Sequence, residues 1–299
     1  SAAYRQLHIL RWRPGQEAHI AELVVCVMSS ARNRHRRDVI RGTWGRDPVV
    51  RTGVGPVALH VLFFLAEGEE ARQEHDEFAD VVILRHMEED FATIWLKTAA
   101  ILKFGSDYFS GRHSGSGGAG GVGVARDTTL RFMLKCDDDA FVDVDAVVAD
   151  LLGSPPVGLY WGHVMALVEP NRQATDKYFV PFEVYPGQYY PPYARGMAYA
   201  LSEDLVIPLG HALGSGAVEP FPYREDVSVG LYLHALAQRG IVKVTPHQRK
   251  DFMPIDFEEH CALPERRDQD LVVLHRFDTA SAPCLWRLVE ARRGAPLGG

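Results

Sequence analysis

Three consecutive carboxylates, Asp137, Asp138 and Asp139, have the residue types and spacing best suited to chemistry in this chain. They follow the apolar run 132–134, and apolar residues resume at Ala140, so the segment is typical of a buried strand and its end. Adjacent carboxylates repel one another and therefore need water or a cation. Clustered oxygen ligands suit Mg²⁺ or Mn²⁺, which predicts a metal site here. The alternative is an acidic turn that caps the following helix.

Alternating strands and helices are predicted to position these carboxylates. Apolar runs predict strands, and helical spacing or capping residues predict helices. The predicted order is strand 22–28, helix 30–41, strand 57–66, helix 67–78, strand 80–84, helix 91–104, the strand that ends in the three carboxylates, and helix 143–152. Such alternation predicts a mostly parallel sheet that helices cover on both faces. Ligands bind outside the carboxyl ends of such strands, so we expect the three carboxylates to share an edge with Ser29 and the arginines that follow it.

A basic cluster at the first helix offers candidates for binding an anion. Free backbone amides and arginine side chains at a helix start can hold phosphate, which makes Ser29, Arg36, Arg37 and Arg41 candidates. Lys97, on a later helix, could also reach an anion. The alternative for each of these cations is a solvated helix face.

The second half of the chain is rich in aromatic residues, proline and glycine. Rings held by proline make flat walls on which sugars stack, so Trp161, Tyr190 and Tyr193 are candidates for contacting a sugar acceptor. The alternative is that these rings form a loop-rich core layer. Later patterns predict helices at 202–213 and 224–238 and strands at 241–244 and 270–275. The glycine-rich stretch 105–127 lacks the Gly-Lys-Ser/Thr ending of a phosphate loop and is predicted to be a flexible surface insertion.

Composition excludes several classes of protein. The chain has 299 residues, 46% hydrophobic, and a net charge of -7, which argues against a general nucleic-acid binder. No run of about 18 apolar residues occurs, so no membrane span is expected. Cys26 and Cys136 lie in strand-like runs and are predicted to be buried thiols, whereas Cys261 and Cys284 could pair.

A series of motifs, taken in order, resembles the β1,3-glycosyltransferase family that includes the β1,3-galactosyltransferases, the β1,3-N-acetylglucosaminyltransferases and the fringe enzymes. The resemblance runs from about Leu23 to Trp286. Its motifs are Arg37-Asp-Val-Ile-Arg-Gly-Thr-Trp44, Phe63-Phe-Leu-Ala-Glu-Gly68, Asp90 through Thr98, Lys135-Cys-Asp-Asp-Asp-Ala-Phe-Val142, Tyr190 through Ser202, and Glu225-Asp-Val-Ser-Val-Gly230.

The resemblance implies an α/β fold of the GT-A type: a nucleotide-sugar-binding mixed sheet flanked by helices in a single catalytic domain, residues 21–290. A nucleotide-sugar half, 21–155, would contain the insertion 105–127, and an acceptor half, 156–290, would follow. Residues 1–20 would be a segment after a membrane anchor and stem, and 291–299 a tail. Family members are type II membrane proteins with a luminal catalytic domain in the Golgi or endoplasmic reticulum.

The resemblance also implies inverting, Mn²⁺-dependent transfer from a UDP-sugar to a hydroxyl of a glycan or glycoprotein acceptor, with Mg²⁺ as the other possible ion. UDP-galactose is the first expected donor, and UDP-N-acetylglucosamine or UDP-N-acetylgalactosamine are the alternatives. A catalytically inactive carbohydrate-binding protein is an alternative of another class. A metal-dependent phosphoesterase would need further ligands for a second metal.

Within this interpretation each candidate residue has an expected role. Asp139 and His275 are the predicted metal ligands, with His247 as the rival to the second. Asp137 would face the nucleoside side, and Asp138 lies between the two other carboxylates. Asp226 is the predicted base, because a base must lie close to the acceptor hydroxyl. The neighbouring Glu225 would bind a sugar hydroxyl.

Overall fold

The computed structural model describes residues 19–90, 93–114, 129–249, 252–254, 272–276, 279–280 and 282–294. Within these ranges, the strands form an eight-stranded sheet in the order β2 (Val49–Thr52), β3 (Gly55–Ala66), β1 (Ala21–Met28), β5 (Leu130–Asp137), β8 (Tyr193–Ser202), β7 (Leu159–Met165) and β9 (Thr245–Gln248), with β4 (Val81–Leu84) also paired to β3. A smaller sheet contains β10 (Phe252–Pro254), β11 (Val273–His275) and β6 (Ala140–Val142).

The large sheet changes direction between its two halves. Strands β1, β3, β4 and β5 are mutually parallel, as the alternating pattern of the first half predicts. Strand β8 then joins β5 in the antiparallel sense, and β7 pairs antiparallel with β8. The predicted α/β class, a mixed sheet flanked by helices, is therefore confirmed.

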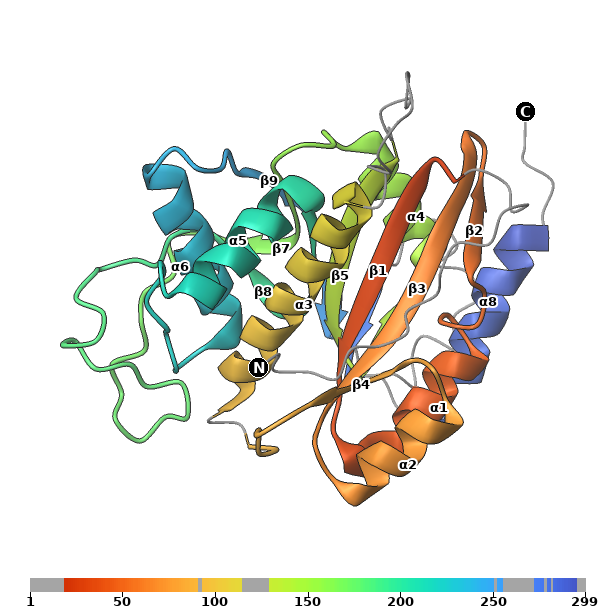
Figure 1. Cartoon of the computed structure of the whole chain (residues 1–299), viewed down its shortest axis with the longest axis horizontal. Helices are drawn as coiled ribbons and strands as arrows, with labels where there is room; N and C mark the ends of the chain where they lie inside the picture. Colours follow the sequence, from red (N-terminus) through yellow and green to blue (C-terminus); the bar gives the residue numbers. More distant parts are fainter. Residues whose placement is uncertain are drawn as a thin grey trace.

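Helices cover both faces of the large sheet (Figure 1). The short 3₁₀ helix η1 (Ala31–Asn33) leads into the first of the α-helices. These are α1 (Arg34–Gly42), α2 (Glu69–Glu77), α3 (Ile94–Ser114), α4 (Val144–Gly153), α5 (Glu203–Ser215), α6 (Glu225–Gln238) and α8 (Ala282–Gly294).

Two apolar cores lie on opposite faces of the sheet because side chains alternate along each strand. One core contains the odd-numbered positions of β1 and packs against apolar residues of α1, α4 and α8. The other contains the even-numbered positions of β1 together with residues of α3, α5 and α6. Both faces are buried, which explains why β1 is a continuous apolar run from Leu23 to Met28 rather than an alternating one.

Helix α3 is longer than its sequence pattern predicts. The predicted end was Phe104, with a flexible insertion beginning at Gly105, but the helix continues to Ser114. A Cβ built at Gly105 would lie 2.5 Å from Met133 Sδ, so the glycine permits close packing against the sheet. Phe109 is fully buried one turn later. Tertiary packing thus offsets the poor helix propensity of glycine, and residues 115–127 of the predicted insertion lie outside the described part.

The aromatic stretch contains strands that its composition conceals. Within 158–199, residues of β7 and β8 form an antiparallel pair with a register shift between Gly162 and Val164. The strand predicted at 241–244 is wrong: the chain there forms no strand, and β9 begins at Thr245. The late strand predicted at 270–275 is found as β11, from Val273.

Candidate functional site

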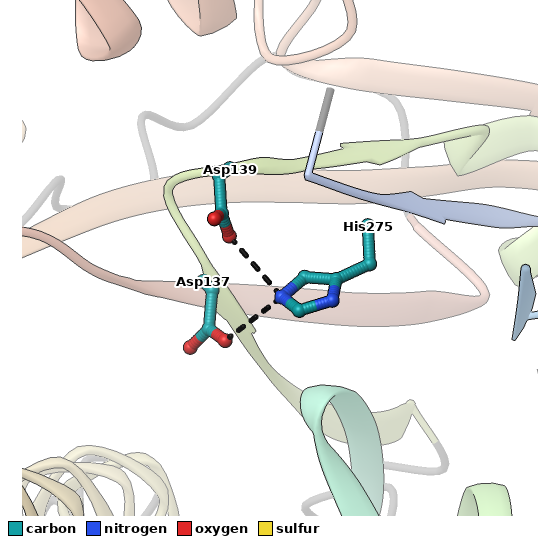
Figure 2. Close-up of side chains that lie close together, drawn as sticks. All are labelled: Asp137, Asp139 and His275. Atoms are coloured by element: carbon teal, nitrogen blue, oxygen red, sulfur yellow. Dashed lines mark ion pairs between the residues drawn. The ribbon is translucent and has the colours of Figure 1, made fainter. Parts of the chain in front are cut away.

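Two carboxylates and an imidazole meet at the carboxyl end of β5 (Figure 2). Strand β11 pairs antiparallel with β6, and this register sets His275 opposite Ala140, directly after the acidic triplet. His275 Nε2 lies 3.4 Å from Asp139 Oδ1 and 3.8 Å from Asp137 Oδ2. One potential ligand atom from each of the three residues lies within 4.8 Å of the others, a donor set that fits a divalent cation.

The two carboxylates of this cluster differ in their electrostatics. Burial raises the pKa of Asp137 above its ordinary value, and the neighbouring charge of Asp139 adds to that effect, although Lys135 opposes it. Burial also favours the neutral form of Asp139, but the hydrogen bond and charge of His275 outweigh it and hold the pKa of Asp139 below its usual value. The surroundings therefore favour the charged form of Asp139 more than that of Asp137.

The rival histidine lies elsewhere. His247 is on β9, and its Nδ1 is 3.3 Å from Ser154 Oγ beyond helix α4. Among the described residues, the potential metal-binding cluster contains His275 and not His247.

A cavity of about 310 Å³ lies beside the cluster and gives it access to a ligand. Its lining comes from the end of β1, the start of η1, the segment before α3, the first turn of α3 and the end of β5. Six of the predicted site residues line it: Ser29, Lys97, Asp137, Asp138, Asp139 and His275. The parallel strands thus bring the predicted groups to one edge of the sheet, as expected.

The middle carboxylate, Asp138, ties β5 to the start of the first helix. Its Oδ2 accepts hydrogen bonds from Ser29 Oγ at 2.7 Å and Asn33 Nδ2 at 2.8 Å. Its Oδ1 accepts one from Arg36 Nη1 at 2.7 Å. Because both oxygens are engaged, Asp138 orders the cavity wall, and Ser29 and Arg36 are held with it.

Lys97 is occupied by the protein itself. Its ammonium donates to the Ser29 carbonyl at 2.6 Å and to both oxygens of Glu89, at 2.8 and 2.9 Å. Burial lowers the pKa of Lys97, although the Glu89 carboxylate counters the effect. Lys97 therefore shapes the cavity wall by joining β1 to the segment before α3.

The structure does not bring Arg37 and Arg41 to the cavity. Arg37 is fully buried, where it pairs with Glu74 and donates to Ser29 Oγ. Arg41 pairs with Glu74 and Asp80, and its guanidinium carbon lies 3.9 Å from the centroid of the Phe78 ring. These arginines are used to pack α1 against α2, a role that a count of basic residues cannot reveal.

Arg32, which the sequence prediction passed over, lines the cavity instead. It is exposed and makes no ion pair with another residue in the described ranges. It belongs to the basic cluster that the sequence indicates, but its position one residue into η1 decides that it faces the cavity.

Lys135 joins one of the two predicted acids at the start of α6, Glu225, to the acidic triplet. The Lys135 ammonium lies 2.8 Å from Asp137 Oδ1 and 3.1 Å from Glu225 Oε1. Asp226 Oδ1 accepts from the Val227 amide at 2.9 Å, and its Oδ2 lies 3.4 Å from Arg224 Nη2. The sequence identifies Lys135 only as part of the acidic motif and gives no sign that its ammonium joins Asp137 to Glu225.

The predicted aromatic acceptor wall is mostly buried. Trp161 is 0% exposed, and its Nε1 donates to Asp150 at 2.6 Å, so the ring belongs to the core and the predicted contact of Trp161 with a sugar is wrong. Tyr190 and Tyr193 are 4% and 3% exposed and pack together in a third apolar cluster. The alternative, a loop-rich core layer, describes these rings better, because proline-bounded aromatics also pack on one another.

Comparisons with known proteins show similarity to glycosyltransferases. Residues 123–241 match the family model described as Galactosyltransferase. The chain is 30% identical over 273 residues to "Beta-1,3-galactosyltransferase GALT1" of Arabidopsis thaliana, an alignment that covers 89% of this chain and 37% of that protein. It is 27% identical to "N-acetyllactosaminide beta-1,3-N-acetylglucosaminyltransferase 4" of Mus musculus, over 94% of this chain and 73% of that protein.

A third relative gives the same result. The chain is 30% identical to "Lactosylceramide 1,3-N-acetyl-beta-D-glucosaminyltransferase A" of Xenopus laevis, over 70% of this chain and 53% of that protein. The chain therefore spans about a third of the plant relative and about half of the frog one. Part of the chain therefore matches the galactosyltransferase family model, and over most of its length the chain is similar to β1,3-galactosyl- and β1,3-N-acetylglucosaminyltransferases.

Proposed function

We propose that this chain transfers a hexose from a UDP-sugar to a hydroxyl of a glycan acceptor, with inversion and formation of a β1,3 linkage. The observation that carries the proposal is the cavity of about 310 Å³ with Asp137, Asp139 and His275 on its wall. UDP-galactose is the first donor we propose. The relatives include both galactosyl- and N-acetylglucosaminyltransferases, so UDP-N-acetylglucosamine is the nearest alternative, followed by UDP-N-acetylgalactosamine.

Asp139 and His275, supported by Asp137, would hold a divalent cation, which we propose to be Mn²⁺, with Mg²⁺ as the alternative. Their mixed oxygen and nitrogen donors fit such an ion, and it would neutralise charge on the departing diphosphate. This task replaces the protonation of the leaving group that an inverting glycosidase assigns to a carboxylic acid.

Asp226 is the proposed base. In one step it takes the proton of the acceptor hydroxyl while that oxygen bonds to the anomeric carbon, and the bond from this carbon to the UDP oxygen breaks. Asp226 lies in the first turn of α6, and its side chain keeps 13% of its surface exposed. The Val227 amide and Arg224 orient the carboxylate.

We also propose that this chain is the luminal catalytic part of a type II membrane protein of the Golgi or endoplasmic reticulum. Among the helices in the described ranges, none combines the length and apolarity required to cross a bilayer. The domain limits 21–290 and the division near residue 155 are part of the same proposal.

A screen of UDP-sugars tests the activity. The chain is incubated with each donor, Mn²⁺ and a panel of galactose- and N-acetylglucosamine-terminated glycans, and released UDP and product mass are measured. We expect one donor to give acceptor-dependent UDP release that stops in chelator and returns with Mn²⁺. Binding of glycans without UDP release from any donor would instead identify the inactive carbohydrate-binding protein.

A further inference from the structure

Lys135 is a buried cation that joins three separate elements. Its side chain is 0% exposed, although lysine is rarely fully buried without partners. Its ammonium donates to Asp137 Oδ1 at the end of β5, to the Gly196 carbonyl of β8 at 2.6 Å, and to Glu225 Oε1 at the start of α6. The three donors of the ammonium thus match three acceptors.

This contact divides the two oxygens of Asp137 between two tasks. Oδ1 is 2.8 Å from the Lys135 ammonium, whereas Oδ2 is the oxygen that faces His275 Nε2 at 3.8 Å. Lys135 therefore fixes the rotation of the carboxylate and turns a single oxygen toward the cluster. A partner behind a ligand commonly sets its orientation in metal sites.

Both carboxylate oxygens of Glu225 also have protein partners. Lys135 contacts its Oε1 at 3.1 Å, and Thr98 Oγ1 donates to its Oε2 at 3.1 Å. A Cβ at position 196 would lie 2.1 Å from Glu225 Oε1, so Gly196 is required for this approach. With both oxygens engaged, Glu225 acts as a strut between β8 and α6, in contrast to the predicted contact with a sugar hydroxyl.

We infer that Lys135 is a positioning residue that fixes the distance and orientation between the metal-site carboxylate Asp137 and the first turn of α6, which carries Asp226. This inference rests on the proposed function. A purely structural ion pair would join the elements without regard to which oxygens remain available. Here the bridge occupies Oδ1 of Asp137 and Oε1 of Glu225, and Oδ2 of Asp137 is left facing His275. Asp226 takes no part in the bridge.

The first test is Lys135→Met, which keeps most of the length of the side chain and removes its charge. Mn²⁺ affinity, measured by electron paramagnetic resonance of free Mn²⁺, is expected to fall about 10- to 100-fold, the usual effect of losing a partner behind a metal ligand. Lys103→Met is the matched control, because Lys103 forms an exposed pair with Asp107 on α3 and should keep wild-type affinity. A folded Lys135→Met chain with wild-type Mn²⁺ affinity would overturn the inference.

A second variant tests the other end of the bridge and decides the case in which Lys135→Met fails to fold. Glu225→Gln keeps the shape of the strut but removes its charge. We expect the kcat of transfer to fall at least about tenfold, the effect of a small misplacement of a catalytic group, while Mn²⁺ affinity stays at the wild-type value. A wild-type kcat for this variant would overturn the link to α6. If the wild-type chain itself released no UDP, the proposed function would fail, whereas the Mn²⁺ affinities would still test Lys135.

Discussion

The two ends of one face of β5 carry clusters of similar composition and different character. Because side chains alternate along a strand, Arg131, Lys135 and Asp137 share a face, with the apolar Met133 between the two cations. At the amino end, Arg131 lies between Glu22 of β1 and Glu203 of α5. At the carboxyl end, Lys135 lies between Asp137 and Glu225 of α6. Each cluster is a buried cation with two carboxylates.

The clusters differ in what remains available to a ligand. At the amino end, Glu22 Oε1 is 3.1 Å from His60 Nε2 and accepts a hydrogen bond from Tyr108, and Glu22 Oε2 is 3.5 Å from Arg131 Nε. At the carboxyl end, Asp137 Oδ2 faces His275 beside the cavity. The ion pairs at the amino end therefore stabilise the fold, because the carboxylate oxygens there contact protein groups. The ion pairs at the carboxyl end leave one oxygen of Asp137 beside the cavity, where it can contribute to a binding site.

The largest effect should follow from Asp226→Asn, beside the carboxyl-end cluster. Loss of a general base typically costs about 10²- to 10⁴-fold in rate, so transfer should nearly stop while UDP affinity stays close to wild type. UDP release and calorimetry of UDP binding measure the two quantities. Glu203→Gln is the control, since Glu203 lies in the first turn of α5 and belongs to the amino-end cluster, at the other end of β5. Wild-type turnover in Asp226→Asn would show that the base lies elsewhere.

A loss of stability should follow from Arg131→Met at the amino end. This change leaves Glu22 and Glu203 without their shared cation, and breaking a buried pair from one side typically costs about 3–5 kcal/mol. Urea denaturation measures the free energy of unfolding, and Mn²⁺ binding to the folded fraction should be unchanged. A loss below about 1 kcal/mol, the range of surface pairs, would contradict the assignment of a structural role to this cluster.

The sequence predicts the elements better than it predicts the partners of their side chains. The apolar run before Asp137 identifies β5, and a late strand ending in His275 predicts this histidine as the second metal ligand, because both signals are local. Which arginine faces the cavity depends on the docking of α1 against α2, and this docking removes Arg37 and Arg41. The bridge made by Lys135 depends on pairing between β5 and β8, which is not a local property of either segment.

The aromatic stretch shows the same limit in another form. Composition favours a wall of exposed rings there, but Trp161 of β7 is buried in the core that also contains residues of α4. Alternation along β7 is masked because both faces of the sheet are buried, so the pattern gives no sign of which rings face solvent. Exposure is instead found at Phe182 and Tyr189, in the segment between β7 and β8.

The smallest effect is expected for Arg32→Ala. This variant tests whether the cavity at the carboxyl end of β5 binds phosphate through a side chain outside the cluster. Arg32 lines the cavity and has no ion-pair partner among the described residues, so its guanidinium is available to a diphosphate in a way that Arg36, held by Asp138, is not. Arg32→Ala should weaken UDP binding about fivefold, or roughly 1 kcal/mol, the upper range for an exposed charge pair.

Two comparisons isolate the cause of that loss. Uridine, which lacks phosphate, should bind Arg32→Ala and the wild type equally in calorimetry. Arg34→Ala is the matched control, because Arg34 pairs with Glu77 on α2 and does not line the cavity, so UDP affinity should be kept. The difference between UDP and uridine should also shrink as salt is raised, since screening weakens an exposed charge pair. Equal losses for UDP and uridine would place Arg32 at the nucleoside rather than at the phosphates.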